Sequence, residues 1–295
     1  MRILVATDGS EFSRKTAEFV VRMGRVLELE IELTQVVDMH RVEYKMLSDL
    51  YVDMIREGAK DAAERILQRE VAFYEEQGMT VSPRVLFGSP GPALCDAVAS
   101  DDFGLLVLGR KGQGGDIQDL LFGSVSNYTV HHAKKPVLVV KGRGPFAQGE
   151  EAKRPLRALI AMDGSVGAKD CLKLASELRP AEGLEVSLLA VIDPERPGFS
   201  YLTPPMRYEA LATLHRDAEA MLRQACEVLR EAGHTVSTRV EEGTPAKTIC
   251  RVYREDEFEI VLMGRKGVGQ LDDAIFGSVS THVLHHCPGH VLLVP

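Results

Sequence analysis

Short apolar runs alternate with longer amphipathic stretches along the whole chain. In the first half, runs at 2–7, 30–37, 80–87, 105–108 and 137–140 have the length and composition of buried strands. Helical patterns separate them at 11–27, at 42–77, in a short stretch that runs through 99, and in a stretch that begins at 124. Gly58 is a candidate break in the second helix. Strands that alternate with helices predict an α/β fold with a parallel sheet and right-handed crossovers.

The second half repeats the first. The segment Ala6-Thr-Asp8-Gly-Ser10 recurs as Ala161-Met-Asp163-Gly-Ser165, an offset of 155 residues (163 − 8). The offset becomes 154 (277 − 123) only after the glycine-rich loop described below. We therefore expect a tandem duplication, with one domain at 1–141 and a second at 156–295. Residues 142–155 have the glycine, proline and charge content of a linker.

Composition narrows the class of protein. The chain has 295 residues, 45% hydrophobic and 26% charged, with a formal net charge of −8. This charge argues against nucleic acid or an anionic membrane surface as the main partner. The 5 cysteines lack CxxC spacing, which favours reduced thiols in a cytoplasmic protein. Cys95 and Cys250 fall within apolar helical patterns and are expected in the core.

One glycine-rich loop occurs in each half, and it carries the clearest chemistry. Gly109-Arg-Lys-Gly112 leads to Gly123-Ser124, and Gly264-Arg-Lys-Gly267 leads to Gly277-Ser278. Each loop follows a strand and ends where a helix begins, so unpaired N–H groups and the helix dipole favour an anion such as phosphate. Ser124 and Ser278 are predicted at the N-cap of that helix.

Each of these features also has a plain structural explanation. Glycines at a strand-to-helix turn can serve close packing alone. Asp8 and Asp163, which follow the first strand of each half, can be turn or capping residues. The Arg-Lys pair inside each loop either meets a phosphate or is a solvated surface pair.

Taken together, the motifs resemble the universal stress protein family. The resemblance rests on the Asp after the first strand, the Val-x-Asp end of the second, and the G-x-x-G loop that leads to Gly-Ser. It covers both halves and implies, in each, five parallel strands in the order 3-2-1-4-5. It also implies binding of an adenine nucleotide: ATP, or ADP or AMP. The implied binding residues are Asp8, Val36, Gly109, Gly112, Gly123 and Ser124 in one half, and Asp163, Val191, Gly264, Gly267, Gly277 and Ser278 in the other; the two valines would offer backbone groups to the adenine.

The two loops differ in length. Ten residues separate Gly112 from Gly123, and nine separate Gly267 from Gly277. We expect tighter ATP binding in the second half, unless the extra residue bulges outward. The carboxylates that follow in the loops either hold Mg²⁺ through water or complement the helix dipole. They are Asp116, Asp119, Asp272 and Asp273.

Histidines cluster near the end of the chain, at positions 282, 285, 286 and 290. A helix would place three of them on one face, where they could bind a metal. Histidines in a last helical turn also complement the dipole, and this interpretation is favoured, so we assign no metal site.

The expected function is that of a nucleotide-binding sensor or regulator in the stress response, with an unknown protein partner. No catalytic residue is assigned, because no nucleophile–base pair stands out and the phosphate-cradling P-loop motif is missing. A slow ATPase and an interaction module without ligand remain as alternatives. The last strands, 137–140 and 291–294, would be apolar edges, and such edges pair readily. We expect the two halves to pair through them as a built-in dimer, and whole chains to associate further.

Overall fold

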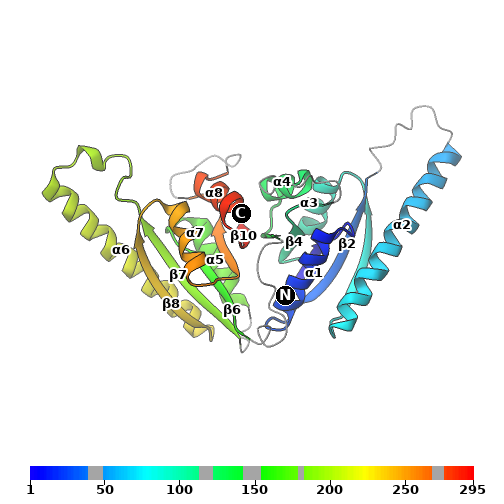
Figure 1. The fold of residues 1–295 in the computed structure, drawn as a ribbon, viewed down its shortest axis with the longest axis horizontal. Helices are drawn as coiled ribbons and strands as arrows, with labels where there is room; N and C mark the ends of the chain where they lie inside the picture. Colours follow the sequence, from blue (N-terminus) through cyan, green and yellow to red (C-terminus); the bar gives the residue numbers. More distant parts are fainter. Residues whose placement is uncertain (39–48, 113–121, 142–153, 179–182, 268–275) are drawn as a thin grey trace. The chain divides into compact units, whose positions relative to one another are not determined.

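The computed structural model describes residues 1–38, 49–112, 122–141, 154–178, 183–267 and 276–295. The chain divides into two compact units, Met1–Gly142 and Arg143–Pro295. Figure 1 shows a sheet with helices in each of them. None of the helices in the described part of the chain is long and apolar enough to cross a membrane.

The first unit alternates strands and helices. In chain order its elements are β1 (Arg2–Ala6), α1 (Glu11–Gly24), β2 (Glu30–Val37), α2 (Asp49–Glu76), β3 (Val81–Phe87), α3 (Pro90–Ser100), β4 (Leu105–Gly109), α4 (Ser124–His132) and β5 (Val137–Val140).

The second unit repeats this order with one short addition, the 3-10 helix η3. Its elements are β6 (Leu156–Ala161), α5 (Val166–Glu177), β7 (Leu184–Ile192), η3 (Phe199–Tyr201), α6 (Pro204–Glu231), β8 (Thr235–Glu242), α7 (Pro245–Glu255), β9 (Ile260–Gly264), α8 (Ser278–His286) and β10 (His290–Val294).

The described residues of each unit form five parallel strands. The order is β3-β2-β1-β4-β5 in the first unit and β8-β7-β6-β9-β10 in the second. The predicted α/β class and the 3-2-1-4-5 order are therefore confirmed. Because right-handed crossovers leave the first strand in both directions, helices cover both faces of each sheet. The pairing of the two halves through their last strands stays a prediction.

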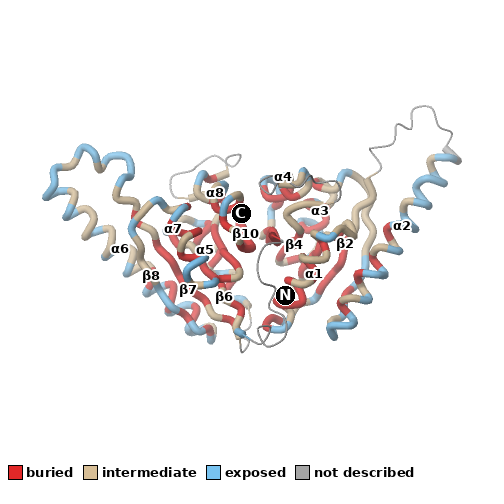
Figure 2. Tube along the Cα trace, in the orientation of Figure 1, coloured by how far each residue is buried: buried red, intermediate tan, exposed pale blue. Residues whose placement is uncertain are grey.

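The central strands form the core of each unit. Figure 2 shows the buried residues along them. Leu105, Leu106 and Val107 of β4 have no exposed surface, and neither do Leu159 and Ile160 of β6. Strands buried on both faces explain the continuous apolar runs in the sequence.

One ion pair is repeated at the same place in both units. Arg84 of β3 lies 2.6 Å from Asp101, and Arg239 of β8 lies 2.9 Å from Asp256. Each aspartate follows the C-terminal end of a helix, α3 or α7. Both arginines are about one third exposed, so each pair contributes little to stability and mainly marks the shared geometry.

The sequence-based helix boundaries need small corrections. The second helix begins in the described residues at Asp49 and runs unbroken past Gly58, where a Cβ would meet nothing within 4 Å. An open helix surface tolerates glycine at a modest cost, so Gly58 does not break the helix. Cys95 and Cys250 are buried, as expected. The proposed linker lies outside the described residues except for its last two.

A buried carboxyl group distinguishes the first unit. Glu70 of α2 is 8% exposed, and its Oε2 has no hydrogen-bond partner among the described residues. Burial raises the pKa of Glu70, as does the nearby Asp8, while Arg14 and Arg69 lower it; burial is the largest of these effects. Arg14 is stacked on an aromatic ring, with its guanidinium carbon 3.6 Å from the centre of Phe73. The second unit has Ala225 at the position of Glu70.

We expect Glu70 to make the first unit less stable as the pH rises. A carboxyl group with a raised pKa in the fold contributes its full stability below its ordinary pKa of 4.5, and loses it as the pH rises through the folded pKa. Glu70→Gln should therefore raise the unfolding temperature at pH 8 more than at pH 5 in calorimetry. Leaving a buried polar atom without its hydrogen bond, as at Glu70 Oε2, costs about 1–3 kcal/mol.

The matched control is Glu75→Gln, on the exposed side of the same helix. This variant should leave the pH profile unchanged. If the unfolding temperatures of the Glu70→Gln and Glu75→Gln variants depended on pH in the same way, Glu70 would not be the source of the pH effect.

Candidate functional site

The candidate site lies where the strand order reverses. In each unit the first and fourth strands are neighbours, and their crossovers leave in opposite directions. Their carboxyl ends are Ala6 and Gly109 in the first unit, and Ala161 and Gly264 in the second. Open α/β sheets bind ligands at this point, because the connecting loops separate there and leave a crevice.

The aspartate after the first strand shapes the following turn. Asp163 Oδ1 accepts a hydrogen bond from the backbone N of Ser165 at 3.0 Å, and Asp8 Oδ1 accepts one from Ser10 N at the same distance. This is an Asx turn, the structural role expected of such a residue. Ser10 and Ser165 cap the next helix, each accepting from a backbone N three residues on.

The second carboxylate oxygen faces the glycine-rich loop. A Cβ added at Gly267 would lie 3.0 Å from Asp163 Oδ2, and one added at Gly112 would lie 2.3 Å from Asp8 Oδ2. The structure thus brings the Asp and the G-x-x-G loop together in both units. Asp163 therefore uses one oxygen for the turn and presents the other to the loop.

The start of the last helix corrects one expectation. The N-caps are Gly123 and Gly277, and neither end has a side-chain cap; Ser124 and Ser278 are the first helical residues and are exposed. The serine two residues further on closes the loop instead. Ser280 Oγ donates to the carbonyl oxygen of Arg265 at 2.7 Å, and Gly277 N donates to the same oxygen at 2.9 Å.

The first unit closes its loop in the same way. Ser126 Oγ donates to Arg110 O at 2.7 Å, and Gly123 N donates to it at 3.0 Å. Of the residues between these closing points, 113–121 and 268–275 lie outside the described residues. The unequal loop lengths, and Asp116, Asp119, Asp272 and Asp273, fall in those segments.

In the second unit the loop also touches the first helix. A Cβ added at Gly264 would lie 2.9 Å from Gly167 Cα, so the two backbones pass each other with no room for a side chain. At the matched position in the first unit, a Cβ on Gly109 would meet Thr16 Oγ1 at 3.0 Å and Phe12 O at 3.4 Å. The second unit is the more tightly packed of the two here.

Val191 presents backbone groups to the same region. Leu189 O accepts from Met162 N at 2.8 Å, so the backbone groups of Leu189 point toward β6. Ile192 O accepts from Gly243 N at 2.9 Å, on the side of β8. Because backbone groups alternate sides along a strand, those of Val191 point to the β6 side, beyond the end of β6.

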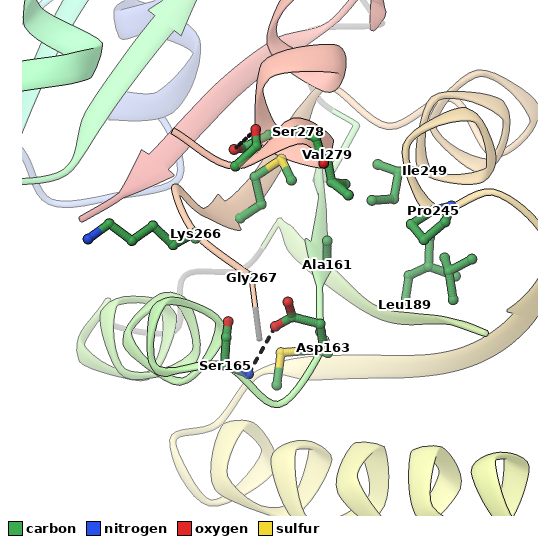
Figure 3. Close-up of a pocket in the computed structure, with 16 residues that line it drawn as sticks. Ala161, Asp163, Ser165, Leu189, Pro245, Ile249, Lys266, Gly267, Ser278 and Val279 are labelled. Atoms are coloured by element: carbon green, nitrogen blue, oxygen red, sulfur yellow. Dashed lines mark hydrogen bonds between the residues drawn. The ribbon is translucent and has the colours of Figure 1, made fainter. Parts of the chain in front are cut away.

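These elements enclose a cavity of about 260 Å³ in the second unit. Its size is slightly below the usual range for small-molecule sites, about 300–1,000 Å³. Leu189, Pro245 and Ile249 form an apolar wall, and Asp163 and Ser165 lie across from it (Figure 3). The other lining residues are Ala161, Met162, Val191, Met263, Gly264, Lys266, Gly267, Gly277, Ser278, Val279 and Ser280. The cavity is thus apolar at the strand and α7 side and polar at the loop and α8 side.

All of the residues predicted for the site of the second unit line this cavity. They are Asp163, Val191, Gly264, Gly267, Gly277 and Ser278. In the first unit the structure brings Asp8 to Gly112 and Gly123 to Arg110. Sequence reasoning missed the apolar wall. The signal was present, since Pro245 opens the helix after a Gly-Thr turn, but the wall appears only when strand and helix are packed together.

Two ionisable groups near the cavity, Cys171 and His282, have shifted pKa values. Burial, with smaller effects from Asp170 and Asp163, raises the pKa of the Cys171 thiol far above its ordinary value, so the thiol stays protonated. In α8, burial lowers the pKa of His282, helped by His286 and Lys247. The described residues contain no group of three His, Cys, Asp or Glu side chains that could hold a metal ion.

Comparisons with known proteins match both halves to one family. The model of the universal stress protein family covers residues 1–141 and 156–295. A universal stress protein of Mycolicibacterium smegmatis is 25% identical over 299 residues, which is 99% of this chain and 96% of that protein.

One solved structure supports the fold over the length of the chain. A universal stress protein from Archaeoglobus fulgidus superposes with a TM-score of 0.70 at 23% identity, over 99% of this chain and 97% of that one. A universal stress protein in complex with cAMP matches 48% of this chain and 98% of its own, at 19% identity and a TM-score of 0.37.

Because Gly264 and Gly167 lie so close together, we expect alanine substitutions at different glycines to change stability by different amounts. Gly264→Ala should destabilise the second unit by about 1–3 kcal/mol, because the new Cβ meets backbone that must shift. Gly109→Ala should cost less, since a side-chain oxygen is the nearest atom. Gly58→Ala should stabilise by about 0.5–1 kcal/mol, because alanine favours the helix and its Cβ meets nothing. Thermal denaturation would measure the order, and equal shifts for Gly264→Ala and Gly109→Ala would contradict the packing described.

Proposed function

Because the chain belongs to the universal stress protein family through both of its halves, we propose that it is a nucleotide-binding regulatory protein whose second unit holds an adenine nucleotide, ATP in the first instance. The observation that carries this proposal is the two-sided cavity of the second unit. One side suits a flat apolar ring, and the other suits an anion.

The apolar side fits a purine base. Leu189, Pro245 and Ile249 offer surface for the face of a ring. The backbone of Val191 adds a donor and an acceptor at the edge of the same space, and a base edge presents both kinds of group. Small-molecule sites commonly combine an apolar wall with a few placed polar groups in this way.

The polar side fits phosphates. Ser278, Val279 and Ser280 open α8 and line the cavity. The first N–H groups of a helix have no partner within the helix, and the dipole makes that end positive. Lys266 comes from the loop and adds a positive charge, although its side chain extends away from the apolar wall in Figure 3. Helix N-termini commonly bind phosphate, so this end of α8 suits the phosphates of a nucleotide.

The same site supports binding without fast chemistry. The described lining carries two ionisable side chains, Asp163 and Lys266. Asp163 already holds the turn through Ser165, and a general base needs a nucleophile within hydrogen-bond reach. We therefore favour a sensor over a slow ATPase, and over an interaction module without ligand. The 5 buried cysteines, none in a disulfide, suit a reducing compartment such as the cytoplasm.

The first test is binding. Calorimetry with ATP, in the presence and absence of Mg²⁺, should show saturable binding to the full chain. Gly267→Val should weaken the second-unit site at least about tenfold, because its side chain would fill the space in front of Asp163 Oδ2. Gly58→Ala, far from any contact, should bind as the parent protein does. A parent protein that shows no heat with any adenine nucleotide would refute the proposal.

The second test is turnover. We expect release of phosphate from Mg-ATP to stay below about 1 s⁻¹, the low end of ordinary enzymes. A coupled phosphate assay on protein freed of contaminating ATPases would measure it. A faster rate that disappears in Gly267→Val would make the protein an enzyme and overturn the sensor interpretation.

A further inference from the structure

The two units differ in the wall of their sites. Of the 16 residues that line the second-unit cavity, 4 are different residues at the matched positions of the first unit. Ile249 and Met263 are replaced by leucines, Leu94 and Leu108, which keeps the wall apolar. The other two changes introduce hydroxyl groups: Met162 is matched by Thr7, and Leu189 by Thr34.

The backbone geometry confirms that these positions correspond. Thr34 is paired with Ala6 in the parallel register of β1 and β2, and Leu189 is paired with Ala161 in that of β6 and β7. Thr7 N donates to Thr34 O at 2.9 Å, as Met162 N donates to Leu189 O at 2.8 Å. The side chain of Thr34 therefore lies on the face of the sheet where Leu189 lines the cavity.

Of the two hydroxyls, that of Thr7 has a hydrogen-bond partner among the described residues and that of Thr34 has none. Thr7 Oγ1 accepts a hydrogen bond from Gly9 N at 3.2 Å and so stabilises the turn before Ser10. Thr34 Oγ1 is buried and has no hydrogen-bond partner among the described residues. Thr34 and Leu189 are equally enclosed, each 1% exposed.

A buried hydroxyl without a partner is unfavourable, at about 1–3 kcal/mol. Such a group is uncommon in a fold and calls for an explanation. A ligand that brings a polar atom to it recovers the missing hydrogen bond, whereas a ligand without that atom leaves the hydroxyl unpaired. This is how a binding site discriminates between closely related molecules.

We propose that Thr34 is a specificity-determining residue of a second nucleotide site, in the first unit, where its hydroxyl hydrogen-bonds to a polar atom of the base. The inference rests on the proposed function, since it assumes that the first unit binds the same class of ligand. With this role for Thr34, the two sites hold the base by different interactions. The second-unit site holds the base by apolar contact and backbone groups, and the first-unit site adds a side-chain hydrogen bond.

The test compares two substitutions at Thr34 in full-length protein whose second-unit site is weakened by Gly267→Val. Thr34→Val keeps the shape and removes the hydroxyl, and should weaken ATP binding about two- to tenfold in calorimetry, the value of one neutral hydrogen bond. Thr34→Ser gives a smaller side chain that keeps the hydroxyl. Its affinity for ATP should stay within about twofold of that of the Gly267→Val protein alone. A packing role predicts the opposite order, with the valine variant unchanged and the serine variant weakened.

A melting curve without ligand serves as the folding control, and Thr34→Val should melt at the same temperature as the parent or higher. If the Gly267→Val protein that also carries Thr34→Val binds ATP as tightly as the Gly267→Val protein alone, the inference fails. If the parent binds ATP but the Gly267→Val protein does not, the first unit has no nucleotide site, so the inference fails while the proposed function stands. If the parent protein binds no adenine nucleotide at all, both fail.

Discussion

Direct backbone contact between the end of the fourth strand and the start of the helix that follows the first strand is the constraint on which the site depends. In the second unit Gly264 and Gly167 approach until no Cβ fits between them, and Gly267 lies against the carboxylate of Asp163. This contact holds the start of α5 and the glycine-rich loop together. The cavity beside it is open because the strand order reverses at that point, which separates the two sets of crossover loops.

Much of this arrangement could be predicted from the sequence, because it depends on local patterns. Buried parallel strands are recognised in the sequence as apolar runs, and a duplicated chain shows each pattern twice.

The N-cap residue at the end of the loop could not be predicted in the same way. In Gly277-Ser278 either residue can cap a helix, and the choice is decided by Ser280, whose hydroxyl reaches back 15 residues to Arg265 O. Only the folded chain brings those two groups together.

The apolar wall was missed for a similar reason. Leu189 lies on β7, and Pro245 and Ile249 lie on α7, so 60 residues (249 − 189) separate parts of one surface. Each of them reads as an ordinary core residue in its own element. Their shared role follows from the order of the strands and the face that each side chain takes. The order was available only through the resemblance to a family, since apolar periodicity alone does not determine which strands are neighbours.

Duplication lets two sites share one backbone and still differ in chemistry. The Asx turn, the loop closure and the strand register repeat in both units with nearly equal distances. Some of the side chains packed on this frame differ: Glu70 is matched by Ala225, and Thr34 by Leu189. Both substitutions put a polar atom without a hydrogen-bond partner among the described residues into the first unit. Such atoms oppose folding, and at Thr34 a bound molecule can supply the missing hydrogen bond.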